Sequence, residues 1–559
     1  MNRLVVLAVV GMLAAGNAQA GGDRAGSSVL AGPGDIAWIE SYSGGPSGPD
    51  SARAIAVDDS GNVVVTGSSE GPGTGMDIAT VKYAPDGTQL WAARFNDTLA
   101  SDDEATDVAV DRFGNVIVTG YGGTSPTDQD YTTIKYSAAG VQQWVARYNS
   151  PDDNGDYASA VAVDDSGNVF VTGWCLNLLA INADYTTVKY NPDGVQLWVA
   201  SYSGNGDDND YARDIAVDSS GNVYVTGDSR TPTDEEDFVT IMYNRAGVQQ
   251  WVARYNGSQN LSDKPVVIAL DPLDDAVVAG WTQVVAGTPS VYSYVTIKYD
   301  YFGNELWKSF YDGPAVGPSY PTDLAIDDSG SVYVTGASTG VGTGLDYATV
   351  KYDEAGHELW VSRFGLHDSG DDVPSDIAVD RSSRVYVTGY TTTAPGLRDY
   401  ATIRYSNLGV RGWTAIYDGP AADDDASAGI GLDSNDNVYV TGSSFFSGAG
   451  LDFLTIKYEA NGTGILENGE RPNPTVLSMA VVPNPAHGST TVGYSSRRPG
   501  ASQLRLYDVN GAVRSTVELG ELSAGEHQAR IDLKRLPKGV YILKLLSGPE
   551  TATSKLVID

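Results

Sequence analysis

The chain has 559 residues, of which 71 are Asp or Glu and 35 are Lys or Arg, so its net charge is −36. This acidic surplus excludes nucleic acid from the expected partners, because phosphate binding needs clustered Lys and Arg. A single cysteine, Cys175, excludes an internal disulfide, so the stability of the fold must come from packing.

The N-terminal 20 residues, 1–20, are predicted to be a secretory signal peptide. Asn2 and Arg3 precede a short apolar run, and a small-residue cleavage motif ends at Ala20. The apolar run is too short to span a bilayer comfortably, and no later segment is long enough. We therefore expect an exported protein without a transmembrane segment.

Residues 21–462 contain one pattern of four segments that occurs eight times. In the first unit the segments are Ala54–Asp58, Val63–Gly67, Ala79–Tyr83 and the stretch around Trp91. They are rich in Val, Ile, Thr and Tyr and are separated by Gly, Asn and Asp, which is typical of short β-strands. Four strands in a period of this length indicate the blades of an all-β propeller. One Trp recurs every 53 to 56 residues and is expected to pack within its blade: Trp38, Trp91, Trp144, Trp198, Trp251, Trp307, Trp360 and Trp413.

The phase of the repeat predicts an eight-bladed propeller that is closed by its N-terminal strand. Each Trp follows a glycine by four residues, and Gly34 and Trp38 keep this spacing before the first full unit. After the last unit, the residue four positions beyond Gly462 is Leu466. The Trp strand that is missing at the end is therefore supplied at the beginning, and such closure protects sheet edges.

The same phase predicts which parts of each blade vary. If the Trp strand is outermost, the Ala-Val-Asp strand lines the central channel. Turns such as Asp58–Asn62 are nearly constant, whereas the loops of the opposite face vary in length and composition, and function usually resides on variable loops of a rigid scaffold. Lys82 and its equivalents in the other units are expected to be charges on the strand surface.

Aromatic residues on the variable face are candidates for ligand binding. Tyr121, Trp174, Trp281 and Tyr390 directly follow the Thr-Gly or Ala-Gly pair of four units. At the rim of this face their rings are placed to stack on sugars or to anchor a peptide. The alternative is that they pack beneath their own loops.

Acidic residues on the same face are candidates for calcium binding. They precede the inner strands, and calcium accepts about six to eight hard oxygen ligands. The alternative is a solvated loop with Asx turns. The candidate ligands are Asp102, Asp103, Asp152, Asp153, Asp207, Asp208, Asp371, Asp372, Asp423 and Asp424.

No catalytic constellation is recognisable in the sequence. His357 lies in a turn and His367 in a loop, so no His-rich metal site can be assembled. Cys175 lacks an identifiable base, and no nucleophile elbow, Walker loop or dinucleotide fingerprint stands in a convincing context. We therefore do not expect an enzyme or a cofactor other than calcium, although the many carboxylates leave glycoside hydrolysis or polysaccharide cleavage open.

The repeat stops after Gly462, and two further parts follow. Residues 463–476, with Pro472 and Pro474, are predicted to be a linker. Residues 477–559 are predicted to form a small immunoglobulin-like β-sandwich. Its expected strands are Thr490–Tyr494, Gln503–Tyr507, Glu526–Ile531, Val540–Leu546 and Thr553–Ile558.

Several separate motifs in this domain resemble the C-terminal sorting domain of type IX secretion. The resemblance implies passage through the periplasm, recognition by the outer-membrane secretion machinery, and release or attachment at the bacterial cell surface. The residues that carry it are Pro483, Asn484, Pro485, Tyr507, Gly511, Gly539, Tyr541 and Lys555.

The repeats resemble the bacterial β-propeller repeat family, for example in Asp164–Gly173 and Thr187–Tyr190. This resemblance implies a fold and an extracellular setting but no single reaction. Three functions follow as hypotheses. The first is a cell-surface binding or adhesion scaffold for a glycan, a peptide or a surface polymer, the second is a carbohydrate-active enzyme that uses loop carboxylates, and the third is a structural surface protein.

Overall fold

The computed structural model describes residues 35–459 and 478–558 apart from short segments. Every helix or strand element that it describes is a β-strand, which confirms the all-β prediction. The predicted signal peptide and linker lie outside the described residues. The short segments that are also excluded are 46–47, 72, 98–101, 126–127, 178–181, 205–207, 232–233, 286–290, 367–369, 394–395, 422, 447–449, 483–485, 487, 497–499, 509–511, 523–524 and 548–549.

Within the described residues the first 32 strands form eight four-stranded antiparallel sheets, which we number 1 to 8. Sheets 1 to 4 are β2 (Asp50–Val57), β3 (Val63–Gly71), β4 (Gly75–Tyr83) and β5 (Gln89–Phe95); β6 (Glu104–Val110), β7 (Val116–Ser125), β8 (Asp128–Tyr136) and β9 (Gln142–Tyr148); β10 (Asp156–Val163), β11 (Val169–Asn177), β12 (Asn182–Tyr190) and β13 (Gln196–Tyr202); β14 (Asp210–Val217), β15 (Val223–Thr231), β16 (Asp234–Tyr243) and β17 (Gln249–Tyr255).

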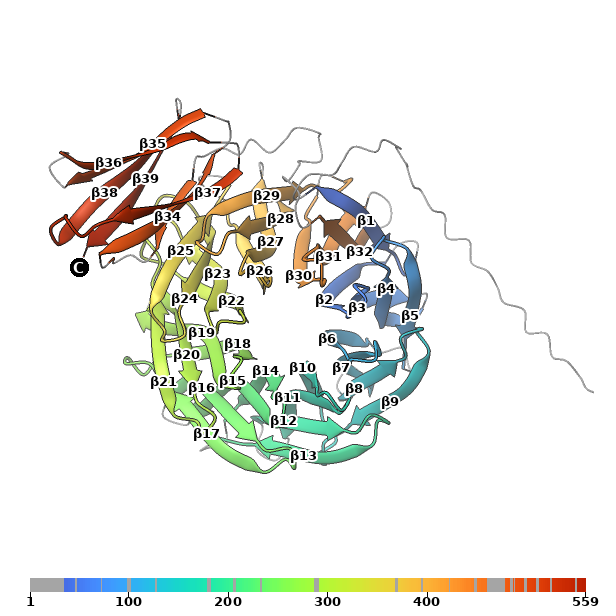
Figure 1. The fold of residues 1–559 in the computed structure, drawn as a ribbon. Helices are drawn as coiled ribbons and strands as arrows, with labels where there is room; N and C mark the ends of the chain where they lie inside the picture. The colour runs from blue at the N-terminus through green and yellow to red at the C-terminus, as the bar shows by residue number, and fades with distance from the viewer. Residues whose placement is uncertain are drawn as a thin grey trace, which may run out of the picture. The chain divides into compact units, whose positions relative to one another are not determined.

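Sheets 5 to 8 are β18 (Asp263–Leu270), β19 (Ala276–Val285), β20 (Val291–Tyr299) and β21 (Glu305–Tyr311); β22 (Ser319–Ile326), β23 (Val332–Thr339), β24 (Leu345–Tyr352) and β25 (Glu358–Phe364); β26 (Val373–Val379), β27 (Val385–Thr393), β28 (Leu397–Tyr405) and β29 (Arg411–Tyr417); β30 (Ala426–Leu432), β31 (Val438–Phe446) and β32 (Gly450–Tyr458) with β1 (Ile36–Tyr42). Figure 1 shows the first strand of each sheet on the inner side and the Trp strand on the outer side, as in a β-propeller.

Strand β1 pairs with β32 and supplies the fourth strand of sheet 8. Trp38 stands opposite Lys457, in the same register as Trp91 opposite Lys82 in sheet 1. The Lys457 Nζ atom donates to the Pro85 carbonyl of sheet 1 at 2.8 Å. Apolar side chains of sheets 1 and 8 also share one hydrophobic cluster, which contains Ala52, Val63, Val65, Ala79, Tyr439 and Phe453.

The periodic Trp residues connect each sheet to the next. The Trp144 Nε1 atom of sheet 2 donates to the Pro192 carbonyl of sheet 3 at 3.0 Å, and Trp38 of sheet 8 donates to Pro85 at 3.1 Å. The turn that receives Trp144 contains Gly194, whose φ is +81° and whose Cβ, if present, would lie 2.7 Å from the indole. The recurring glycine therefore serves both a left-handed turn and the close approach of the Trp from the preceding sheet.

A recurring Lys is buried, which corrects the prediction of a strand-surface charge. Lys82 is 1% exposed, and its Nζ atom lies 2.8 Å from Asp58 in the turn after the inner strand. Hydrogen bonds from Lys82 and Asn62 lower the pKa of Asp58 although burial opposes them. The prediction was wrong because neighbouring sheets cover both faces of the third strand. The same ion pair joins Lys135 to Asp111, Lys298 to Asp271 and Lys351 to Asp327.

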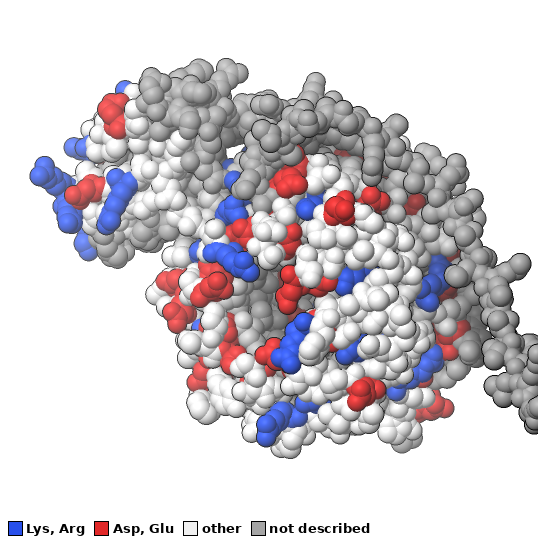
Figure 2. All heavy atoms as spheres, turned by 45° about the vertical axis from the view of Figure 1, so that its right-hand side comes forward, with Lys and Arg blue, Asp and Glu red and all other residues white. Residues whose placement is uncertain are grey.

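Charge is unevenly divided between the repeats and the C-terminal part. Residues 480–559 carry ten Lys and Arg against seven Asp and Glu, so the acidic surplus lies in the repeats. On the face that Figure 2 shows, acidic and basic side chains are interspersed among uncharged ones.

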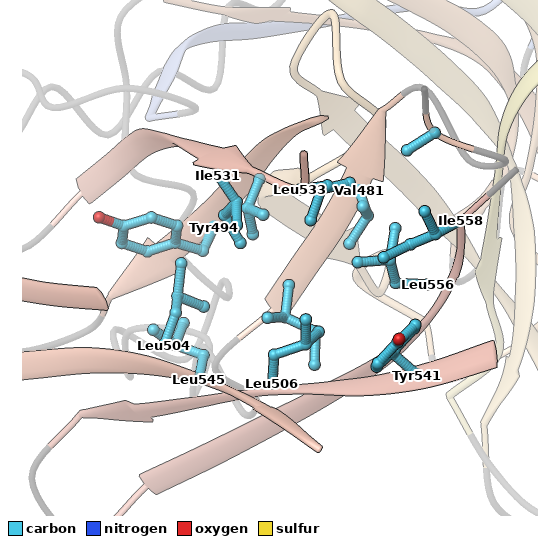
Figure 3. Packing of buried hydrophobic residues seen from close by; sticks show 13 residues of the cluster. Val481, Tyr494, Leu504, Leu506, Ile531, Leu533, Tyr541, Leu545, Leu556 and Ile558 are labelled. Carbon is cyan, nitrogen blue, oxygen red and sulfur yellow. The ribbon is translucent and has the colours of Figure 1, made fainter. Parts of the chain in front are cut away.

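The C-terminal part contains two antiparallel sheets. One is β33 (Ser478–Val482), β34 (Ser489–Ser496) and β37 (Gly525–Asp532), and the other is β36 (Val513–Leu522), β35 (Gly500–Asp508), β38 (Gly539–Ser547) and β39 (Glu550–Ile558). Tyr494 and Ile531 of the first sheet face Leu504, Leu506 and Leu545 of the second in one core (Figure 3). All five predicted strands are present, and β33 and β36 are additional.

Candidate binding site at the central channel

The inner strands of all eight sheets line one cavity of about 320 Å³. In each inner strand one residue bulges out of the pairing with the second strand, and this residue lines the cavity together with the residue after it. Bulges commonly re-aim side chains next to functional sites. The bulged residues are Arg53, Thr106, Ser159, Arg213, Val266, Thr322, Ser375 and Ala428.

Four of the residues that follow a bulge are Asp, and each of these carboxylates links two sheets. Asp107 accepts the Val161 N–H of the next sheet at 2.9 Å, and Asp214 accepts the Ile268 N–H at 2.8 Å. Burial raises the pKa of Asp107 to about 7 and that of Asp214 to about 6. Both groups therefore titrate near neutral pH, and their first role is structural because backbone donors hold them.

The other two channel carboxyl groups, Asp323 and Asp376, form a pair in sheets 6 and 7. Burial raises the pKa of both, and the charge of Asp376 with the hydrogen bond between them raises the pKa of Asp323 further. A hydrogen bond between two carboxyl groups requires that they share one proton. Each also accepts a backbone N–H of the next sheet, from Ile377 at 3.1 Å and from Ile430 at 2.7 Å.

Aromatic side chains gather at the end of the channel where the variable loops lie. Tyr157 and Trp174 form a cross-strand pair, and their rings stack with centroids 4.2 Å apart. Trp174 meets Tyr211 of sheet 4 edge-on at 5.3 Å, and Tyr157 meets Tyr121 of sheet 2 at 5.0 Å. These four rings, which we call the aromatic row, cross three sheets, and all four are only partly buried.

Polar groups flank the aromatic row at both ends. The Arg213 guanidinium lies 5.5 Å from the Tyr211 ring centroid and forms an ion pair with Asp228 at 2.7 Å. The Tyr121 hydroxyl donates to Glu104 at 2.9 Å. A partly exposed apolar surface with a few fixed polar groups is the usual composition of a small-ligand or sugar-chain site.

The other two predicted aromatic residues lie in sheets 5 and 7, outside the aromatic row. Trp281 meets Tyr292 edge-on at 4.7 Å, and the Arg398 guanidinium lies 4.5 Å from the Tyr390 ring centroid. The structure thus brings Tyr121 and Trp174 together and leaves Trp281 and Tyr390 with partners of their own sheets.

The acidic pairs before the inner strands divide into one buried and one exposed carboxylate. Asp103 is fully buried and accepts the Asp97 N–H at 2.8 Å, whereas exposed Asp102 accepts the Met76 N–H of the preceding sheet at 2.9 Å. The remaining pairs follow this division only in part.

The pair in sheet 7 repeats this arrangement, because buried Asp372 accepts the Leu366 N–H and exposed Asp371 accepts the Leu345 N–H of the preceding sheet. Asp424 likewise accepts the Arg398 N–H. Asp152, Asp153, Asp208 and Asp423 lie in loops, and Asp207 lies outside the described residues. Calcium binding by these ten residues stays a prediction.

The remaining motif residues are placed as follows. Tyr541 is buried and its hydroxyl donates to the Pro537 carbonyl at 2.8 Å, while Lys555 is exposed on β39. Tyr507 lies on β35 and is partly buried, and Gly539 begins β38. Pro483, Asn484, Pro485 and Gly511 lie outside the described residues.

The single thiol is not a poised nucleophile. Cys175 is buried beside the stacked Trp174, and burial raises the pKa of its thiol. A reactive cysteine needs an accessible thiolate.

The channel carboxyl groups were not identified from the sequence. The position after the bulge is Asp in four sheets, whereas the other four have Ala54, Ala160, Val267 and Gly429 there. An alignment of the eight units by their Ala-Val-Asp segments would have exposed this difference between units, because a residue needed by every blade would recur in every blade.

Comparison with protein families identifies two parts of the chain. Residues 480–559 match the family described as secretion system C-terminal sorting domain, and residues 200–230 and 359–396 match the family described as β-propeller repeat. Both matches confirm the resemblances in the sequence. The sorting domain indicates a bacterial protein that is secreted or displayed at the cell surface and that interacts with the type IX machinery. The described residues contain no helix with the length and hydrophobicity of a membrane span.

Individual similar proteins are distant. An uncharacterised WD repeat-containing protein of Acanthamoeba polyphaga mimivirus is 23% identical over 488 residues, which cover 63% of this chain and 33% of that protein, so the chain spans about a third of this relative. PorZ, a surface component of the type IX secretion system of Porphyromonas gingivalis, is 14% identical with a TM-score of 0.34, and the match covers 90% of this chain and 65% of PorZ. A polysaccharide lyase that acts on ulvan is 11% identical with a TM-score of 0.39, covering 63% of this chain and 91% of the lyase.

Proposed function

We propose that the protein is a closed, eight-bladed β-propeller that acts as a binding or adhesion scaffold at the bacterial cell surface. The pairing of β1 with β32 and the contact of Trp38 with Pro85 support a closed ring, because the same contacts join neighbouring sheets elsewhere. The sorting domain supports delivery to the surface.

The aromatic row carries the proposal of a binding role. Tyr121, Tyr157, Trp174 and Tyr211 form partly exposed ring contacts across three sheets, and side chains that served only their own blades would not form such a row. Aromatic faces bind the apolar faces of sugar rings and the side chains of peptides, while flanking charges orient the ligand. We propose a glycan chain as the first candidate ligand, with a peptide as the alternative.

We propose that the protein binds its ligand without converting it. The carboxyl pair Asp323 and Asp376 is the strongest acid–base candidate in the channel, since perturbed pKa values cluster at functional sites. Glycoside hydrolysis, however, uses two carboxyl groups about 5 to 9.5 Å apart, with the sugar between them. A pair that is directly hydrogen-bonded and also held by backbone N–H groups leaves no room for that arrangement.

A glycan and polysaccharide array with the mature chain tests this function. We expect binding that Trp174→Ala weakens at least tenfold, because the central ring of the row is lost. Phe113→Ala is the matched control, since Phe113 is 61% exposed in the constant turn of sheet 2. Product analysis of every hit separates binding from cleavage, and a cleaved product would overturn the non-catalytic proposal. If no glycan binds, a peptide array tests the alternative, and failure of both would favour a structural role.

A further inference from the structure

A pair of buried carboxylates recurs where one sheet meets the next. One Asp lies on the third strand of a sheet and the other precedes the inner strand of the following sheet, as Asp77 and Asp103 do between sheets 1 and 2. In three sheets an Arg three residues after the periodic Trp neutralises the third-strand Asp. These ion pairs are Arg94 with Asp77 at 2.8 Å, Arg254 with Asp237 at 2.8 Å and Arg363 with Asp346 at 3.0 Å.

The junction of sheets 7 and 8 lacks this Arg, as do sheets 3 and 8 with Ser201 and Ser41 at its position, and differs from them by a third carboxylate. Ile416 occupies the position of the Arg, opposite Ala401 just as Arg94 stands opposite Ala79. A third carboxylate, Asp418, is added in the loop after β29. Carboxylate oxygens of Asp399, Asp418 and Asp425 lie within 4.8 Å of one another, and this is the only such group of potential metal ligands among the described residues.

Within the described part of the chain none of the three carboxylates forms an ion pair with Lys or Arg, and Asp425 accepts only the Gly419 and Phe445 N–H groups, at 2.6 and 3.0 Å, from the backbone. Asp399 and Asp425 are buried, and Asp418 is exposed. Burial and then the neighbouring carboxylates Asp418 and Asp425 raise the pKa of Asp399 to about 6. A buried group of like charges requires a proton or a cation.

A buried hydroxyl group points into the same space. Ser444 is 0% exposed, and its Oγ atom forms no hydrogen bond of normal length among the described residues, although the hydroxyl lies close enough to Asp425 to lower the pKa of that carboxyl. The Oγ atom lies 2.4 Å from the place that a Cβ on Gly419 would take, and the two Asp425 carboxylate oxygens lie 2.7 and 2.8 Å from that place. In sheets 1 and 4 the equivalent hydroxyls of Ser69 and Ser229 accept from the Arg guanidinium. Sheet 8 has Ser41 at that Arg position, so Ser444 lacks this donor.

We propose that Asp399, Asp418, Asp425 and Ser444 bind one calcium ion, which takes the place that the Arg guanidinium has in other sheets. All four side chains offer hard oxygen ligands, and no imidazole or thiol belongs to the group. Calcium is favoured over magnesium because the ligands come from two strands and two loop ends, and calcium tolerates such irregular geometry. Solvent reaches the site through Asp418, and water molecules complete the coordination. The site joins sheet 7 to sheet 8 and is independent of the aromatic row.

Equilibrium dialysis of the full mature chain against calcium chloride, with elemental analysis of the retained metal, tests the site directly. We expect one calcium ion per chain that Asp418→Asn releases, with at least a tenfold loss of affinity. Asp312→Asn is the matched control. Asp312 occupies the same loop position in sheet 5, is exposed, and has Ser293 and Ser319 where the cluster has buried Asp residues. This control should retain the ion.

A second variant tests the charge argument and does not remove a ligand. Ile416→Arg places a guanidinium where four other sheets have one, and in three of those sheets it pairs with the third-strand Asp. Without calcium, the variant should therefore melt at the same temperature as the calcium-bound native chain, and adding calcium should not change its Tm. The native chain should melt a few degrees higher in calcium than in EDTA, and less so in magnesium. No retained calcium in the native chain, or equal retention by Asp418→Asn, would overturn the proposal. Preference for magnesium would overturn the choice of ion. None of these readouts depends on glycan binding.

Discussion

The replacement Lys82→Met tests how much the buried ion pairs stabilise the repeats. Lys82 is 1% exposed and its Nζ atom lies 2.8 Å from the Asp58 carboxylate and 3.3 Å from the Gly114 carbonyl of sheet 2. Met preserves the length and apolar stem of the side chain but removes the charge. The variant therefore leaves Asp58 as a buried carboxylate without its cation.

The expected loss of unfolding free energy depends on the hydrogen bonds that Asp58 keeps in the variant. Removing one partner of a buried ion pair costs about 3 to 5 kcal/mol. Asp58 keeps hydrogen bonds from the Ser60 N–H, the Asn62 N–H and the Asn62 side-chain amide, which places the expected cost near the lower limit, at about 3 kcal/mol. Sheet 4 supports this limit, because it has Met242 at the Lys position and Asp218 with the same three donors.

Differential scanning calorimetry of the mature chain measures the effect. An unfolding entropy of about 2.1 cal/mol/K per residue, over roughly 420 residues of repeat, corresponds to about 0.9 kcal/mol/K, so Tm should fall by about 3 °C. The double variant Lys82→Met with Asp58→Asn should recover more than half of this loss, because the uncompensated charge is gone. A fall below about 1 °C, or a double variant no more stable than the single one, would refute the reasoning.

Three further outcomes are expected in the same assay. Gly194→Ala should lower the free energy of unfolding by about 2 kcal/mol or more, since its φ is +81° and the new Cβ would lie 2.7 Å from Trp144. Gly73 has the same φ but nothing within 4 Å, so Gly73→Ala should cost only about 1 kcal/mol. Equal losses of stability in the two variants would contradict a role for the Trp144 contact. Trp38→Ala should lower Tm as much as Trp144→Ala if the ring is closed, and a much smaller fall would argue for an open ring. Lowering the pH from about 8 to about 5 should raise Tm. The pKa of Asp107 is about 7 in the folded chain, above its value near 3.9 when unfolded, so the folded state binds more protons in this window; a flat or falling Tm would count against it.

The sequence repeat made the strands of the propeller-like sheets predictable, whereas the C-terminal strands and the burial of Lys82 lay outside what the repeat could indicate. Trp spacing and Thr-Gly pairs placed the strands of the repeats because every unit repeats the same packing problem. The strands of the C-terminal part occur once each and lack such support, and β36, which was missed, alternates polar and apolar residues weakly. Lys82 was misjudged for a different reason. The prediction assumed a solvated face for the third strand, but the faces of propeller sheets stack on one another.

The candidate sites lie where the units differ from one another. A side chain that occurs in every sheet, such as the periodic Trp, is explained by the packing that every sheet shares. Ile416 and Asp418 have no such explanation, because three equivalent sheets neutralise the same buried Asp with Arg. Trp174 likewise stacks on a ring that most units lack. Replacing a residue that only one or a few units have, such as Trp174 or Asp418, should therefore change stability little and weaken binding strongly. Introducing the residue that other units have at the position, as in Ile416→Arg, should stabilise the repeats and abolish the calcium site.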